Sequence, residues 1–173
     1  FHTHVAEHFA AEGYDFYAVD LRKCGRSRRS GQSWHYASDL ALYFTDLTAA
    51  LDAIPNDEVL VIAHSTGGLI APLWMDHLRR TDQERHQRLS GLILNSPWLD
   101  MMGVPGQVLT PLKPLLYTLG RIAPMTPLPG GNLTAYGESV HKDFYGEWDF
   151  DLRFKPLAGH KKYVGWIAAV FHG

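Results

Sequence analysis

The chain has 173 residues, enough for one domain with a substantial buried core. Hydrophobic residues make up 46% and charged residues 20%, and the formal net charge of −2 provides no basic field for nucleic acid or for an anionic membrane surface. The single cysteine, Cys24, excludes an internal disulfide and favours a reducing, cytoplasmic location, and no apolar run is long enough to span a bilayer.

The first twenty residues predict a helix followed by a strand. Phe1, Val5 and Phe9 recur every four residues, and Gly13 stands where a helix C-cap glycine is expected. The chain opens within this helical pattern and not on a methionine, so we expect residues to be missing upstream. Residues 14–20 (YDFYAVD) are aromatic and β-branched, which predicts a strand.

A polar loop and a second helix come next. The loop over residues 21–34 carries a local cluster of basic residues that we interpret as solvated: Arg22, Lys23, Arg26, Arg28 and Arg29. Ser38 is the expected N-cap of the helix, which Pro55 ends. The apolar face of this helix has alternating spacings of four and three and comprises Leu40, Phe44, Leu47, Leu51 and Ile54.

Two further strands flank a third helix. Residues 58–64 and 91–95 are nearly continuous apolar runs, as is typical of strands buried on both faces, and residues 66–80 between them predict a helix that contains Pro72. Alternation of helices and strands with right-handed crossovers predicts a parallel sheet that helices cover on both faces.

The remainder of the chain differs in composition and shows few regular patterns. Residues 98–160 hold most of the prolines together with scattered aromatic residues and methionines, which indicates an insertion over the active site and not more sheet. These apolar side chains suit either an acyl-binding groove or a small separate core. Residues 161–172 regain helical spacing through Val164, Ile167 and Phe171.

The most informative motif is Ala63-His64-Ser65-Thr66-Gly67-Gly68, which follows the strand over 58–64. A strand that ends in small-x-Ser-x-Gly and opens a helix is the pattern of a nucleophile elbow, with small residues, here Ala63 and Gly67, two positions on either side of the serine. Such a turn exposes the Ser65 hydroxyl and places the Thr66 N–H at a helix N-terminus, where it can stabilise an oxyanion. The alternative is that Ser65 only caps the helix.

Three segments together resemble the α/β-hydrolase fold family, and within it the branch of lysophospholipases, monoacylglycerol lipases and serine aminopeptidases. They are residues 14–27, the elbow at 63–69, and residues 94–100 (LNSPWLD). The resemblance implies a parallel-sheet α/β-hydrolase core, here partial and a fragment, with an irregular or helical cap. It also implies Ser65 as nucleophile and Thr66 as one oxyanion donor. Ala63 replaces the more usual glycine, which its small side chain makes tolerable.

The same resemblance divides the chain into three parts. Residues 1–97 correspond to the N-terminal half of the core, residues 98–160 to the cap, and residues 161–173 to a helix leading toward a C-terminal core. In this fold an acid and then a histidine follow the serine on later strands. No downstream residue stands after a recognisable strand in that way; the candidates include Asp76, Asp100, Asp143, Asp149, His77, His141 and His160. We therefore expect the isolated chain to be nearly inert.

These observations predict a serine hydrolase that cleaves a small ester with an apolar acyl chain. A peptidase or amidase would use the same elbow, and a non-catalytic binding protein could keep the fold without the triad. His64 points to the opposite face of its strand and cannot serve as the base. His2, His4 and His8 lack a carboxylate or cysteine to complete a metal site, so neither a metal ion nor another cofactor is expected.

Overall fold

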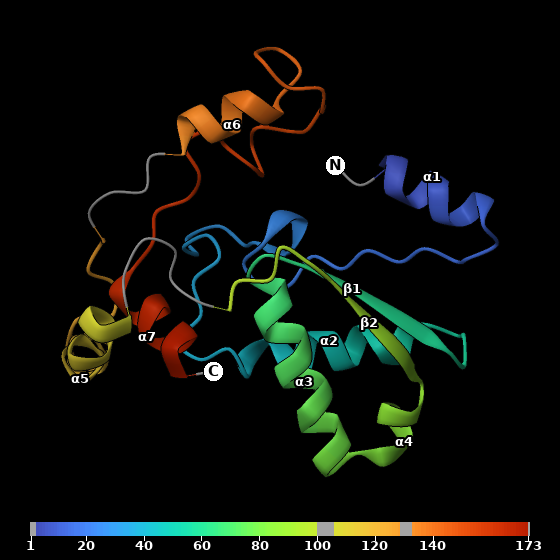
Figure 1. The fold of residues 1–173 in the computed structure, drawn as a ribbon, viewed down its shortest axis with the longest axis horizontal. Coiled ribbons are helices and arrows are strands. Elements are labelled where there is room, and N and C mark those ends of the chain that lie inside the picture. Colours follow the sequence, from blue (N-terminus) through green and yellow to red (C-terminus); the bar gives the residue numbers. More distant parts are fainter. Residues whose placement is uncertain (1–2, 100–105, 129–132, 173) are drawn as a thin grey trace. The chain divides into compact units, whose positions relative to one another are not determined.

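The computed structural model describes residues 3–99, 106–128 and 133–172, and the chain forms two compact units (Figure 1). Unit 1 comprises Phe1–Tyr36 and Pro127–Lys162, and unit 2 comprises Ala37–Thr126 and Tyr163–Gly173. The residues of the predicted cap are thus divided between the two units. Phe1, His2 and Asp100 lie outside the described residues.

Unit 2 contains a two-stranded parallel sheet. Strand β1 (Val59–His64) pairs with β2 (Leu89–Asn95), in a register that runs from Leu60 opposite Gly91 to His64 opposite Asn95. Helices α3 (Gly67–Thr81) and α4 (Gln83–Gln87) connect them. The two strands and the helix predicted between them are confirmed, and α3 runs through Pro72.

One face of this sheet is covered by α2 (Leu42–Ala53) and α3. Leu51 of α2 packs with Trp74 and Leu78 of α3, and all three side chains are at most 3% exposed. Val59 and Val61 of β1 pack against this cluster because alternate residues of a strand point to the same face. Burial of these apolar side chains is the main stabilisation of unit 2.

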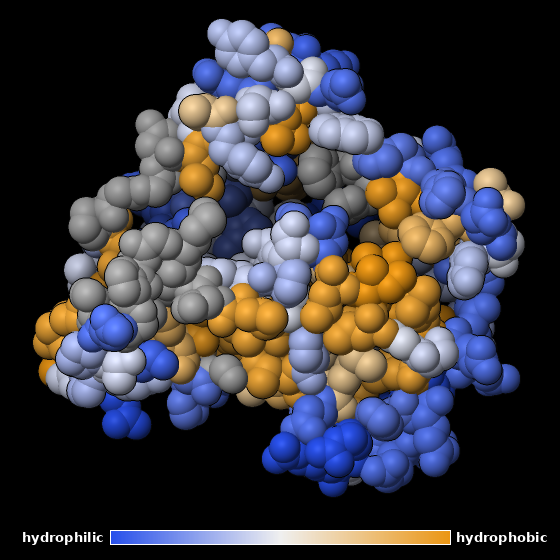
Figure 2. Space-filling model, viewed as in Figure 1, coloured by the Kyte–Doolittle hydropathy of each residue, from blue (hydrophilic) through white to orange (hydrophobic). Residues whose placement is uncertain are grey.

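The prediction that helices cover both faces is wrong for the described part of this unit. Leu60, Ile62 and Ile93 are 36%, 44% and 44% exposed. Figure 2 shows apolar side chains gathered over β1 and β2. The reason is geometric: α2 and α3 both pack on the Val59–Val61 side, so the intervening residues of β1 face away from them.

The start of α2 also differs from the prediction. The helix begins at Leu42, and the Ala41 N–H donates to the Asp39 carboxylate at 2.8 Å, whereas Ser38 caps nothing. The turn that precedes the helix lets backbone carbonyls accept the first helical N–H groups, with Leu42 N–H donating to the Asp39 carbonyl and Tyr43 N–H to the Leu40 carbonyl, so no capping side chain is needed. Leu40 just before the helix is buried, as its place in the apolar pattern predicted.

Helices α5 (Gly106–Ile122) and α7 (Val164–His172) form the other packed part of unit 2. Gly120 of α5 lies so close to α7 that a Cβ atom there would come within 2.8 Å of the Ala168 Cβ. The Tyr117 hydroxyl donates to the Phe171 carbonyl at 2.8 Å. The C-terminal helix is confirmed, and α5 forms although it contains two prolines.

Unit 1 contains α1 (Thr3–Ala11), the short 3₁₀ helix η1 (Gly25–Ser27) and α6 (Thr134–Val140). The N-terminal helix is confirmed, and Gly13 after it has a left-handed φ of +86°. The strand predicted over residues 14–20 is wrong, and Tyr14 and Tyr17 are 54% and 50% exposed. Aromatic and β-branched side chains suit a pleated surface, but a strand also needs a neighbour to accept its backbone hydrogen bonds. Within the described ranges no helix is both long and apolar enough to cross a membrane.

Two histidines of unit 1 lie against the Trp34 ring system. The rings of Trp34 and His160 are stacked with centroids 4.7 Å apart, and the His35 ring lies 4.6 Å from that of His160. Desolvation of the imidazole by the neighbouring rings, and then the charge of His160, lowers the pKa of His35 to about 4 from its usual 6.5. His35 is therefore neutral at physiological pH.

This depressed pKa makes the stability of the protein sensitive to acid. Because the unfolded chain binds a proton at His35 near pH 6.5 and the folded chain only near pH 4, stability present above pH 6.5 is lost as the pH falls through this window. His35→Asn should flatten this dependence, since asparagine tolerates the φ of +54° at this position. Thermal midpoints at about pH 7 and about pH 4.5 would test the prediction, with His8→Asn on the exposed surface of α1 as the control. An equally steep loss of midpoint in His35→Asn would contradict it.

Candidate active site

The turn between β1 and α3 exposes a serine in an unusual backbone conformation. Ser65 has a φ of +52°, in the left-handed region that favours glycine, and the residue is exposed to solvent. Ala63, two residues earlier, is 8% exposed. A non-glycine residue with this φ stores backbone strain, and such strain persists only where neighbouring structure holds it.

Backbone hydrogen bonds from the segment after β2 hold the Ser65 peptide. The Ser65 N–H donates to the Asn95 carbonyl at 3.1 Å, and the Ser65 carbonyl accepts from the N–H groups of Gly68 at 2.9 Å and Trp98 at 3.0 Å. Trp98 in turn stacks on Trp166 of α7, with ring centroids 5.4 Å apart. Both backbone polar groups of Ser65 are therefore satisfied, and the residue as a whole is exposed to solvent.

Thr66 supplies an N–H group at the N-terminal end of α3. Within the described part of the chain this N–H donates no hydrogen bond. The helix has 15 residues, and the partial positive charge of a helix N-terminus favours an anion beside its free N–H groups. The position is therefore suited to stabilise negative charge that develops on a carbonyl oxygen attacked by Ser65.

Of the two glycines in this turn, Gly68 has less room for a side chain. A Cβ on Gly67 would lie 3.9 Å from the Ala63 Cβ, which is an ordinary contact. A Cβ on Gly68 would lie 2.6 Å from the Pro97 Cβ and 2.7 Å from the Pro97 Cα. The sequence motif offers a second glycine at this position, but only the folded structure shows that the segment after β2 crosses it.

Three histidines of unit 2, His64, His77 and His172, contact groups other than the Ser65 hydroxyl. His64 Nδ1–H donates to the same Asn95 carbonyl that accepts the Ser65 N–H, at 3.0 Å. The His77 ring lies 5.3 Å from the ring of Phe44, and that of His172 lies 6.5 Å from Tyr117. Among the described histidines of this unit, none is hydrogen-bonded to Ser65.

Asp76, a carboxylate of the same unit that the sequence offered as a candidate, is engaged on the surface of α3. Its carboxylate pairs with Arg79 and Arg80, each at 2.7 Å. The hydrogen bond from Arg79 lowers the pKa of Asp76. This ion pair is local to the helix and does not orient a histidine.

The candidate residues of unit 1 also have local partners. His141 is 3% exposed; its Nε2–H donates to the Phe150 carbonyl at 3.2 Å, and its Nδ1 accepts the Asp143 N–H at 3.1 Å. His160 Nε2–H donates to the Phe154 carbonyl at 3.0 Å. Asp149 pairs with Lys142, whose hydrogen bond lowers the pKa of the Asp149 carboxyl. These contacts tie each group to its own loop.

The residues that the structure describes include no group of three histidine, cysteine, aspartate or glutamate side chains placed to hold a metal ion. The His4 ring instead stacks on Trp148, with centroids 4.3 Å apart. In the Ser65 turn, Ser65 contributes a hydroxyl and Thr66 a backbone N–H.

A parallel β–α–β unit with a small-x-Ser-x-Gly turn at the end of its first strand is the arrangement found in hydrolases of the α/β-hydrolase fold. The family described as "Serine aminopeptidase, S33", a family of such hydrolases, matches residues 1–143. The chain belongs to this family, which confirms the resemblance seen in its motifs. The small two-stranded sheet represents part of the α/β-hydrolase fold. No curated protein matches the sequence.

Proposed function

We propose that this chain carries the nucleophile of a serine hydrolase that cleaves carboxylic esters through an acyl-enzyme on Ser65. The observation that supports this most is that Ser65 is an exposed residue held at a φ of +52° on the turn between β1 and α3. A serine that only capped the helix would have no need of a strained conformation. Membership of a hydrolase family agrees with this proposal.

In the proposed reaction the Ser65 hydroxyl oxygen attacks the ester carbonyl carbon while a general base takes the hydroxyl proton. The carbonyl oxygen becomes an oxyanion, which the Thr66 N–H stabilises. Collapse of this intermediate breaks the bond to the alcohol, which leaves with the proton from the base. Water then hydrolyses the acyl-enzyme and regenerates the serine.

The acid and base of this reaction are proposed to come from outside this chain. None of the described histidines in the unit of Ser65 is bonded to it, and a serine without a base is a weak nucleophile. The isolated chain is therefore proposed to be inactive, with residues 98–160 acting as a cap over an apolar acyl group in the complete enzyme. The family description, serine aminopeptidase, supports amide hydrolysis as the second candidate.

A fluorophosphonate probe tests the proposal, because it reacts much faster with an activated serine than with an ordinary hydroxyl group. We expect the complete open reading frame to form the adduct on Ser65, located by mass spectrometry, and Ser65→Ala to abolish it. Ser96→Ala is the matched control, since Ser96 is also exposed and has a similar φ of +47°. Parallel assays with nitrophenyl esters and aminoacyl nitroanilides would distinguish ester from amide hydrolysis.

Two results would overturn parts of this proposal. Absence of an adduct on the complete protein, or an adduct that persists in Ser65→Ala, would exclude catalysis by Ser65 and favour a non-catalytic binding protein. Ester turnover by the 173 residues alone that disappears in Ser65→Ala would show that the acid and base lie within this chain.

A further inference from the structure

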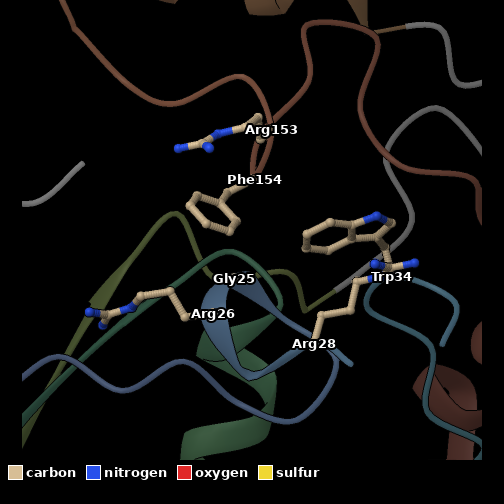
Figure 3. A pocket seen from close by; sticks show the side chains of 6 residues that line it. All are labelled: Gly25, Arg26, Arg28, Trp34, Arg153 and Phe154. Atoms are coloured by element: carbon tan, nitrogen blue, oxygen red, sulfur yellow. The ribbon is translucent and has the colours of Figure 1, made fainter. Parts of the chain in front are cut away.

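Unit 1 contains a shallow cavity, widely open to solvent, that is lined by three arginines and two aromatic rings. Its volume is about 440 Å³, which lies within the range typical of small-molecule sites. Figure 3 shows the six residues that line it, which come from two distant segments of the chain: Gly25, Arg26, Arg28, Trp34, Arg153 and Phe154. All six belong to the same compact unit.

The rings of Trp34 and Phe154 form an apolar wall of this cavity. Trp34 and Phe154 meet edge to face, with centroids 6.5 Å apart and planes at 74°. The stacked His160 ring supports the indole, and His160 is itself held by its hydrogen bond to the Phe154 carbonyl. A planar apolar group can pack against such rings through offset or edge contacts.

Charged groups surround this wall. In Figure 3 the ring of Phe154 lies between the side chain of Arg153 on one side and those of Arg26 and Arg28 on the other. Arg26 Nε donates to the Asp20 carboxylate at 2.8 Å, and Arg153 is paired with Asp151. The three guanidinium groups and two carboxylates leave an excess of one positive charge around the cavity.

Arg28 carries that excess charge. Its Nε donates to the Gln32 carbonyl at 2.9 Å, and its guanidinium lies 4.6 Å from the centre of the Trp34 ring. Among the described residues no carboxylate pairs with Arg28, so its terminal N–H groups are open to an anion. A guanidinium presents these donors in a fork that matches carboxylate and phosphate oxygens.

The loop that carries Arg26 and Arg28 is built around Asp20. The Asp20 carboxylate accepts the backbone N–H of Arg26 at 3.2 Å, and its carbonyl accepts the Ser27 hydroxyl at 2.7 Å. A Cβ on Gly25, where φ is +45°, would lie 2.7 Å from the Asp20 Cγ. The basic cluster interpreted from sequence as a solvated loop is therefore partly ordered at the cavity.

We propose that this cavity binds a small aromatic anion, with its ring against Trp34 and Phe154 and its carboxylate or phosphate on the Arg28 guanidinium. Calorimetric titration of the protein with phenyl phosphate and benzoate at low salt tests this, and the tighter probe assigns the anionic group. Benzyl alcohol and inorganic phosphate, which each lack one half of the proposed ligand, should bind at least about tenfold more weakly.

Variants locate the binding. Arg28→Gln should weaken the tighter aromatic anion at least about tenfold, whereas Arg29→Gln, in the same loop but outside the lining, should change its affinity less than about twofold. Arg153→Gln should weaken binding several-fold, and this exposed position gives a second test if Arg28→Gln does not fold.

Several results would overturn the proposal. They are the absence of saturable binding by either aromatic anion at millimolar concentration, equal losses in Arg28→Gln and Arg29→Gln, and equal binding of benzyl alcohol or inorganic phosphate. The titration involves no residue of the elbow, so its outcome is independent of catalysis by Ser65.

Discussion

Gly68→Ala is expected to lower the free energy of unfolding by about 2–3 kcal/mol, whereas Gly67→Ala should change it by less than about 0.5 kcal/mol. The added methyl group of Gly68→Ala would meet the Cβ and Cα of Pro97 at 2.6 and 2.7 Å, and neither atom can move without its backbone. The Pro97–Trp98 segment must then shift, which weakens the hydrogen bond from Trp98 to Ser65. The helix-forming advantage of alanine is about 1 kcal/mol in a helix interior and smaller in the first turn, where both glycines lie, so it offsets only a small part of this cost.

Urea unfolding followed by far-UV circular dichroism measures both variants. The pair is matched in chemistry and adjacent in sequence, so a difference between them isolates the contact with Pro97. Equal stability of the two variants would show that the segment after β2 does not cross Gly68. Where the fluorophosphonate labels Ser65, Gly68→Ala should also reduce the rate of labelling. The reason is that the N–H groups of Gly68 and Trp98 both donate to the Ser65 carbonyl.

Trp74→Ala is expected to be the most destabilising of the substitutions considered, by about 3–5 kcal/mol. Trp74 is 3% exposed, packs with Leu51 and Leu78, and donates its indole N–H to the Thr48 hydroxyl at 3.0 Å. The substitution removes a large buried side chain from the junction of α2, α3 and the sheet. Helices packed on one side of two strands have few other contacts to compensate for the cavity.

Two variants separate the contributions. Trp74→Phe keeps most of the ring packing but loses the hydrogen bond to Thr48. The lost hydrogen bond should lower the free energy of unfolding by about 1 kcal/mol, in addition to the effect of the smaller ring. Trp148→Ala, at a tryptophan that is 44% exposed, should cost less than about 1 kcal/mol. Urea unfolding of the three proteins measures these differences. A cost for Trp74→Ala no larger than that for Trp148→Ala would contradict the packing described for unit 2.

The segments that the sequence predicted correctly are those whose secondary structure is determined by their own local pattern of residues. The apolar run of β1, the helix after it and the second strand follow from local periodicity and turn residues, and their parallel pairing follows from the crossover between them. The segment at 14–20 has an equally strong strand pattern but forms no strand, because pairing depends on a neighbour that the pattern does not contain.

In the candidate sites too, local features could be predicted from the sequence and long-range contacts could not. The Ser65 motif stands within six consecutive residues, so it is visible in the sequence. The crowding of Gly68 by Pro97 and the meeting of Trp34 with Phe154 join residues that are far apart in the chain. No local signal marks such contacts, since they depend on how distant segments are packed. The absence of a Ser38 cap on α2 depends on the turn before the helix, in which the Asp39 carboxylate accepts the Ala41 N–H.

The backbone attachment of Ser65 has a mechanical consequence. Its N–H is bonded to the last residue of β2, and its carbonyl to Trp98 three residues further on. Residues 96–98 therefore cannot be displaced without either moving Ser65 with them or breaking one of these hydrogen bonds. The position of the Ser65 side chain therefore depends on backbone hydrogen bonds to β2 and to the loop that follows it. While these bonds hold, motion of residues 96–98 would move the Ser65 hydroxyl as well.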